Sequence, residues 1–287
     1  MIKKGLVEYM LSLELKKMAW RMRCRALKMA LDAGPNGAHL GPAFSMMEIT
    51  AVLFQSIIRM CPESIHSPNR DRFILSKAHA VLAYYTGLFE CGIIDEHDLD
   101  SFEKNGSDFP GHPIMSHKIG VEFPGGSLGM GLPFAVGCAM AGKLNNQSFR
   151  TFAILGDGEC NEGSVWEAAM AAAHYKLNRL CAVVDRNHLQ YDGDTEDIMS
   201  LGDFSAKWSS FGWDVKSVDG HDVEALLTVF ASVPNSDNPL VVIAETVKGK
   251  GVSFMENNRE WHHGRLSSIQ YDEALRELNE YASEEFK

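Results

Sequence analysis

The sequence has few of the features that mark nucleic-acid-binding, secreted or membrane proteins. Basic residues are outnumbered, with 27 Lys and Arg against 38 Asp and Glu, so the formal net charge is −11. Binding to nucleic-acid phosphates needs a concentrated basic surface, and this charge argues against such a partner. The N-terminus has no uninterrupted apolar segment of the kind that forms a signal peptide or a membrane span. We therefore expect a cytoplasmic protein without membrane association.

The six cysteines lack the paired CxxC spacing of metal and redox motifs. Most lie among apolar neighbours, as reduced core residues do in cytosolic proteins. We find no internal repeat or interdomain linker, and 287 residues, 45% of them hydrophobic, can bury a large core. We expect a single domain over residues 1–287, with N-terminal helices in about 1–60 and a C-terminal surface tail at about 267–287.

The stretch from Thr151 to Leu189 carries the clearest pattern of the chain. Two short apolar runs, at 152–155 and 180–184, flank an Ala-rich helical segment between Glu162 and Tyr175. Strand, helix and strand within about forty residues form a βαβ unit, whose two strands are parallel. Strands alternate with helical patterns elsewhere too, which predicts an α/β fold with a mainly parallel sheet and helices on both faces.

The periodicity predicts further elements on both sides of this unit. Apolar residues recur every three or four positions from Leu11 to Ala30, which predicts a helix with one buried stripe and basic remaining faces. A membrane-surface or nucleic-acid helix is one interpretation, and a helix that faces solvent or a partner is the one we favour. Other helices are predicted at about 46–58, 127–144, 203–211 and 223–231, and strands at 72–75, 213–218 and 240–247.

Two polar side chains follow the strands of the βαβ unit. Asp157 lies in Gly156-Asp157-Gly158 directly after the first strand, and Asn187 follows the second. Ligands bind beyond the carboxyl ends of parallel strands, so neighbouring strands would bring the two side chains together. Their oxygens suit Mg²⁺ or Ca²⁺, while the glycines and the next helix N-terminus suit a phosphate. The pattern predicts a metal that holds a diphosphate; the alternative is an ordinary Asp-Gly turn.

This pattern resembles the thiamine diphosphate fingerprint. Four further segments are similar to transketolases and occur in transketolase order: DRFILSKAHA (71–80), FPGHP (109–113), GGSLGMG (125–131) and VKGKGVSFME (247–256). The chain therefore resembles the N-terminal half of a transketolase. The resemblance implies the thiamine diphosphate-binding fold, that cofactor held through Mg²⁺ or Ca²⁺, and transfer of a two-carbon ketol unit from a ketose phosphate to an aldose acceptor.

The resemblance also implies the residues of the site. Four histidines in Gly/Pro-flanked turns or at strand ends would contact the cofactor diphosphate and the sugar hydroxyls: His39, His79, His112 and His263. The register of His263 against its neighbour His262 stays open. Any one of these histidines alone could equally bond nearby backbone, and zinc-ligand spacing is missing. Cofactor contacts are implied for His79, Gly126, Ser127, Leu128, Gly156, Asp157, Gly158, Glu162, Asn187 and His263, and metal contacts for Asp157, Asn187 and Leu189.

Two glutamates after the Gly-Asp-Gly loop have two interpretations. Glu162 and Glu167 stand where transketolases also carry glutamates, and the resemblance suggests a hydrogen-bonded link toward the site of a partner subunit. The alternative is that both are helix N-terminal carboxylates that the helix dipole stabilises. Both interpretations can hold for Glu162.

The matched segment lacks one part of a thiamine site. In transketolases a following domain supplies the glutamate that activates the pyrimidine ring, but only 36 residues follow Gly251, too few for another α/β domain. The resemblance implies the N-terminal subunit of a split transketolase, paired with a separate C-terminal subunit in a heterotetramer of two copies of each. Helices at 127–144 and 168–173 are candidate contacts. The alternatives are a fragment similar to deoxyxylulose-phosphate synthase, the thiamine subunit of a 2-oxo acid dehydrogenase, and a non-catalytic regulatory subunit.

Overall fold

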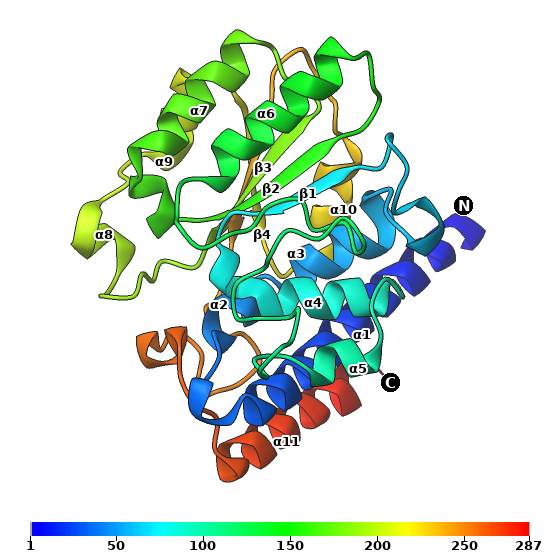
Figure 1. Ribbon diagram of the computed structural model, residues 1–287, viewed down its shortest axis with the longest axis vertical. Coiled ribbons are helices and arrows are strands. Elements are labelled where there is room, and N and C mark those ends of the chain that lie inside the picture. The colour runs from blue at the N-terminus through cyan, green and yellow to red at the C-terminus, as the bar shows by residue number, and fades with distance from the viewer. Residues whose placement is uncertain (1, 287) are drawn as a thin grey trace.

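A parallel sheet of five strands forms the centre of the molecule, as the sequence predicts (Figure 1). The computed structural model describes residues 2–286, and the surroundings of the side chains from residue 9 to 286. Every neighbouring pair of strands is parallel, and the spatial order is β1-β2-β3-β5-β4. The strands are β1 (Arg72–Leu75), β2 (Thr151–Gly156), β3 (Leu180–Arg186), β4 (Asp214–Asp219) and β5 (Leu240–Glu245).

Helices cover both faces of the sheet (Figure 1). Successive strand residues alternate between two apolar cores: Phe152 and Ile154 belong to one, and Ala153 and Leu155 to the other. The strands other than β4 therefore have nearly continuous apolar sequences, as buried parallel strands do, while β4 at the sheet edge is mostly polar. The first core includes helices α2 (Leu40–Phe44), α3 (Met47–Val52), α4 (Val81–Glu90) and α10 (Val223–Ala231), and the second includes α6 (Gly131–Leu144), α7 (Gly163–His174) and α9 (Phe204–Ser210).

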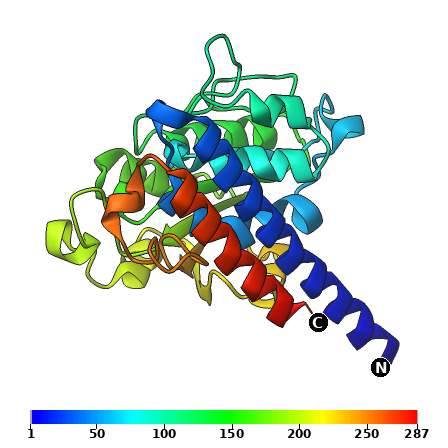
Figure 2. The same ribbon diagram turned by 90° about the horizontal axis from the view of Figure 1, so that it is seen from below.

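The first and last helices lie side by side along one side of the molecule (Figure 2). Helix α1 (Ile2–Asp32) contains the helix predicted from the buried stripe. Helix α11 (Ser268–Glu285) forms the predicted tail, and its Ala274 and Leu278 are buried in the first core. Helix α11 is therefore packed against the core along one face and exposed to solvent on its other faces. No helix within residues 2–286 is long and apolar enough to cross a bilayer.

Several predicted elements differ from the structure, including the helix expected at about 46–58, of which α3 forms only Met47–Val52. The helix expected over 127–144 begins only at Gly131, because the chain turns at Gly129, where φ is 78°. The polar loop before α9 contains a short helix, α8 (Thr195–Met199), which the side chain of Asp194 caps by accepting a hydrogen bond from the amide of residue 196. A second short helix, α5 (Glu96–Asp100), follows α4.

A buried charge network ties α1 to the segment that follows β5. Arg23 of α1 donates two hydrogen bonds to Glu48 of α3, at 2.5 and 2.8 Å, and its Nε donates to Lys250 O at 2.9 Å. His221 Nε2 accepts from the Val247 amide at 2.9 Å, so its proton lies on Nδ1, which donates to Glu48 at 2.9 Å. This Arg23–Glu48–His221 network therefore holds the backbone at 247–250 at both ends.

Candidate functional site

A cavity of about 380 Å³ lies beyond the carboxyl ends of the central strands. β2 and β3 pair in register up to Gly156 and Asp185, so Asp157 and Asn187 both follow strand ends at the same edge of the sheet. Most of the predicted site residues line this cavity: His39, His79, His112, Gly126, Leu128, Gly156, Asp157, Gly158, Asn187 and Leu189.

Asp157 is a buried carboxylate held by short local hydrogen bonds. Its Oδ1 accepts from the Gly158 amide at 2.8 Å, and its Oδ2 accepts from the His188 amide at 2.8 Å and the Thr195 hydroxyl at 3.2 Å. Among the described side chains it has no ion-pair partner, and burial raises the pKa of Asp157. A buried carboxylate without a cationic partner fits a site for a metal ion.

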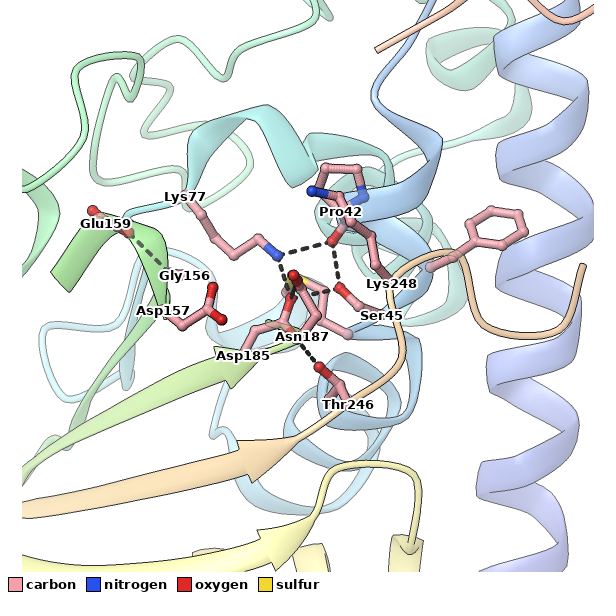
Figure 3. Close-up of polar contacts among 12 residues, drawn as sticks. Pro42, Ser45, Lys77, Gly156, Asp157, Glu159, Asp185, Asn187, Thr246 and Lys248 are labelled. Atoms are coloured by element: carbon pink, nitrogen blue, oxygen red, sulfur yellow. Dashed lines mark hydrogen bonds and ion pairs between the residues drawn. The ribbon is translucent and has the colours of Figure 1, made fainter. Parts of the chain in front are cut away.

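Asn187 lies beside a buried ion pair (Figure 3). Its amide nitrogen donates to Asp185 Oδ2 at 3.2 Å, and its oxygen accepts from the Leu189 amide at 3.2 Å. Asp185 is fully buried and pairs with the ammonium group of Lys77, which also donates to Pro42 O at 3.0 Å. Although burial alone would raise the pKa of Asp185, the charge of Lys77 holds it below its ordinary value.

Glu159 fastens the Gly-Asp-Gly loop to the neighbouring strand end. Its carboxylate accepts from the Gly156 amide at 3.0 Å, from the Gly129 amide at 2.9 Å, and from the Ser76 hydroxyl. Burial raises the pKa of Glu159. A side chain on Gly131 would collide with Ser76, because an added Cβ would lie 2.4 Å from Ser76 Cβ. These contacts fix the loop that enters α6 and place Gly126 and Leu128 at the cavity.

Five histidines meet at the open side of the cavity. The ring of His39 lies between the others, with ring centres 5.4 Å from His79, 5.5 Å from His112, 5.6 Å from His262 and 4.4 Å from His263. Burial, helped by neighbouring histidines, lowers the pKa of His39 to about 3, and burial also lowers the pKa of His79 and His112. These imidazoles are therefore neutral near pH 7, each with one donor and one acceptor nitrogen.

His262 lines the main cavity, whereas His263 lies exposed in an adjoining cavity of about 310 Å³ with His39 and His112. The cause is a change of backbone: a turn of 3₁₀-helix ends at His262, and His263 is extended, with φ −144° and ψ 129°. The two neighbouring side chains therefore point in different directions. His262 is therefore the member of the pair that lines the main cavity, and His263 contacts the histidine group from outside it.

Two other predicted residues lie outside the cavity lining. Ser127 is exposed in the loop before α6, and Glu162 is exposed at the start of α7, where its side chain caps no amide. The predicted helix N-terminus does not face the cavity either, because a 3₁₀ turn, Gly158–Asn161, separates the Gly-Asp-Gly loop from α7. The glycines of that loop, Gly156 and Gly158, line the cavity themselves, and an added Cβ on Gly158 would lie 2.6 Å from Gln190.

Sequence reasoning missed two lysines that enter the cavity. Lys77 lies two residues after β1, and Lys248 lies three residues after β5; both side chains are almost fully buried. Lys248 donates to Leu189 O at 2.8 Å and lies 3.0 Å from His262 Nδ1. Burial, with help from the charge of Lys77, lowers the pKa of Lys248 to about 8. The sequence feature that could have identified both lysines is their position, because each follows a strand whose carboxyl end borders the site.

The fold and the cavity together define an α/β domain built to bind a diphosphate: acidic and amide oxygens, two buried lysines and open glycine backbone meet at one sheet edge. The comparisons with known proteins agree. Residues 16–286 match the family described as the thiamine diphosphate binding domain of transketolase. The chain belongs to the transketolase family.

Curated relatives of similar length are named as transketolase subunits. One subunit of the apulose-4-phosphate transketolase of Phocaeicola vulgatus is 41% identical over 243 residues, which are 84% of this chain and 86% of that one. A 6-deoxy-6-sulfo-D-fructose transketolase subunit of a Clostridium species is 35% identical over 84% of this chain and 88% of its own. The family match favours a transketolase over the dehydrogenase, synthase and regulatory alternatives.

Solved transketolases have the same fold over part of their length. The structure of the Campylobacter jejuni enzyme superposes with a TM-score of 0.84 at 27% identity. It matches 92% of this chain but only 42% of the longer Campylobacter chain. The chain therefore spans about two fifths of that solved relative. The superposition confirms the predicted fold class.

Proposed function

We propose that this chain is the diphosphate-binding subunit of a transketolase assembled from two kinds of chain. The assembled enzyme transfers a two-carbon ketol unit from a ketose phosphate to an aldose acceptor. The observation that carries the proposal is a single cavity that combines Asp157 and Asn187 with a wall of neutral histidines. A metal-held diphosphate fits the first part, and a polyol fits the second.

The residues of the cavity fit thiamine diphosphate held through Mg²⁺ (or Ca²⁺). Asp157 and Asn187 offer side-chain oxygens, and Leu189 offers a carbonyl oxygen that already accepts a hydrogen bond from the ammonium group of Lys248. A carbonyl oxygen has two lone pairs, so one remains for a cation. Lys77 and Lys248 add positive charge beside the place of the diphosphate. When bound, the cofactor supplies the nucleophilic carbon that cleaves the bond beside a ketose carbonyl.

The histidines are suited to hold the sugar and move its protons. His39, His79 and His112 are neutral, so each can donate one hydrogen bond to a hydroxyl and accept another. His263 contacts the same group from the outer cavity. Neutral rings also leave a substrate hydroxyl free to lose or gain a proton without a fixed charge opposite it.

The partner is a separate C-terminal subunit, which supplies the glutamate that activates the pyrimidine ring. The relatives named as subunits support this division. The outer faces of α6 and α7 support it as well: Met130, Phe134 and Met170 are 50%, 37% and 59% exposed, although the inner faces of both helices are buried. Apolar groups of this kind are typical of interfaces that bury about 2,000 Å² or more. Exposed Glu162 lies beside these helices, toward the same partner.

The proposal includes a heterotetramer with two copies of each chain, in the cytoplasm, acting on sugar phosphates. All six cysteines are unpaired, which supports a reducing compartment. The test is light scattering and a transfer assay with a panel of ketose phosphates, on the purified chain with and without the C-terminal subunit. We expect transfer only from the mixture. A monomer or homodimer of this chain that transfers two-carbon units unaided would overturn the proposal.

A matched pair of variants tests the surface. Met170→Lys places a charge on the outer face of α7 and should weaken assembly with the C-terminal subunit by tenfold or more. Ile269→Lys, at a residue that is 80% exposed on α11, is the control and should assemble like the parent. Equal assembly of both variants would exclude the α7 face from the interface.

A further inference from the structure

The carboxylate of Asp185 lies below the cavity and accepts four hydrogen bonds from side chains. Asp185 is the second-last residue of β3 and fully buried. Its Oδ1 accepts from the Thr246 hydroxyl, and its Oδ2 accepts from the Ser45 hydroxyl at 2.5 Å, from Lys77 Nζ, and from the Asn187 amide nitrogen at 3.2 Å (Figure 3). Four segments of the chain thus meet at one carboxylate below the cavity.

Stability alone does not explain this arrangement. Removing two charges from water costs several kcal/mol per ion, and replacing a buried ion pair by uncharged residues of similar size is often neutral or stabilising. Lys77 and Asp185 are both almost fully buried. Their position gives a different explanation, because two of the four groups that donate to Asp185 line the cavity: the ammonium group of Lys77 and the amide of Asn187.

An amide side chain has two ends of similar size, and a site for a cation needs the oxygen end. Asp185 Oδ2 already accepts from the ammonium group of Lys77 and from the Ser45 hydroxyl, so the end of Asn187 that faces it is the donating nitrogen. The oxygen is then turned the other way, where it accepts from the Leu189 amide at the cavity. The ion pair with Lys77 holds the carboxylate in place.

We propose that Asp185 is a positioning residue that sets the orientation of the Asn187 amide, so that its oxygen faces the metal. The inference deepens the proposed function and rests on it. Partners that orient metal ligands typically contribute 10- to 100-fold in metal affinity when they are removed. Asp185→Asn keeps the shape of the side chain but removes its charge. One weaker amide oxygen must then serve the ammonium group of Lys77, the Ser45 hydroxyl and the Asn187 nitrogen together, so the Asn187 amide is held less firmly.

The experiment measures metal binding without any turnover. The full-length chain is dialysed to equilibrium with Mn²⁺ and inorganic pyrophosphate, and bound Mn²⁺ is counted. We expect Asp185→Asn to bind Mn²⁺ 10- to 100-fold more weakly than the parent. The matched control is Asp71→Asn, which removes another fully buried, ion-paired carboxylate at the opposite edge of the sheet and should leave Mn²⁺ binding unchanged.

A double variant separates orientation from folding. Lys77→Met with Asp185→Asn leaves no charge unpaired, so it should regain stability relative to Asp185→Asn alone, while Mn²⁺ binding stays weak. Parent-like binding by either Asp185 variant would overturn the inference. If Asn187→Ala binds Mn²⁺ weakly in that case, the proposed metal site survives. If Asn187→Ala also binds like the parent, the metal site itself fails, and the inference with it. Should Asp185→Asn not fold, the double variant is compared with Lys77→Met alone, because Lys77 itself lines the cavity, and binding equal to that of Lys77→Met would overturn the inference.

Discussion

Replacing Glu48 by Gln should destabilise the protein by about 3 kcal/mol. The change keeps the shape of the side chain but removes its charge, which two hydrogen bonds from Arg23 and one from His221 surround. An amide presents a donor where one of these donors points, so at least one charged hydrogen bond is lost. Breaking a buried pair from one side costs about 3–5 kcal/mol. The lower value applies because Arg23 keeps two carbonyl acceptors, on Phe44 and Lys250.

The assay is urea denaturation at pH 7, followed by circular dichroism. The matched control is Glu280→Gln, which removes an exposed ion pair with Arg276 on α11 and should cost less than about 1 kcal/mol. Equal losses for the two variants, or a loss below about 1 kcal/mol for Glu48→Gln, would refute the reasoning. The variant should also bind pyrophosphate more weakly, because the network holds the backbone on both sides of Lys248.

The pH dependence of this loss is a second test of the same network. Although burial alone would raise the pKa of Glu48, the charge of Arg23 holds it well below the ordinary value of 4.5. A group with a lowered pKa in the folded state contributes its stability above the unfolded pKa and loses it as the pH falls toward the folded value. The stability gap between parent and Glu48→Gln should therefore be complete above about pH 4.5 and shrink below it.

Three further predictions concern the cavity and the opposite sheet edge. Asp157→Ala or Asn187→Ala should abolish Mg²⁺-dependent cofactor binding in the assembled enzyme with the fold intact, and unchanged affinity by calorimetry in both would exclude them as ligands. His79→Ala or His112→Ala should slow turnover by roughly 10²–10³-fold with the metal still bound, and parent-like kinetics would exclude both as transition-state donors. Burial alone would raise the pKa of Asp71, but hydrogen bonds from two arginines hold it below the ordinary value of 3.8. The stability that the Asp71 carboxylate contributes should therefore be lost as the pH falls below about 3.8. Acid unfolding curves of parent and Asp71→Asn with the same shape would contradict this.

The elements of the sheet could be predicted because their sequence signals are local. Four of the strands are built on apolar runs that polar or glycine residues end, whereas the edge strand β4 has only two apolar residues. Helix α10 begins and ends where its periodicity predicts. The βαβ unit then places Asp157 and Asn187 at one edge by topology alone. The predicted boundary was wrong where a tertiary contact sets it. Helix α6 begins at Gly131, whose amide donates a hydrogen bond to the Ser76 hydroxyl.

The supporting residues of the site could not be predicted from composition or spacing. Lysine is normally exposed, so nothing local indicates that Lys77 and Lys248 are buried beside each other. Asp185 looks like an ordinary strand-end residue until side chains that follow β1, α2 and β5 converge on it. His262 and His263 differ only through the backbone turn between them. Such residues depend on segments that meet only in the folded chain.

The order of the strands has a consequence for how the chain folds during synthesis. β1 pairs only with β2 among the described strands, and roughly eighty residues separate Arg72 from its partner Thr151. At ~5–20 residues per second, a ribosome needs roughly 4 to 16 seconds to make that segment. During this time β1 has no partner strand and the helices around it have no sheet to pack against. Their apolar side chains stay exposed to water or form loose clusters. The nascent chain is therefore most dependent on chaperones before residue 151 emerges.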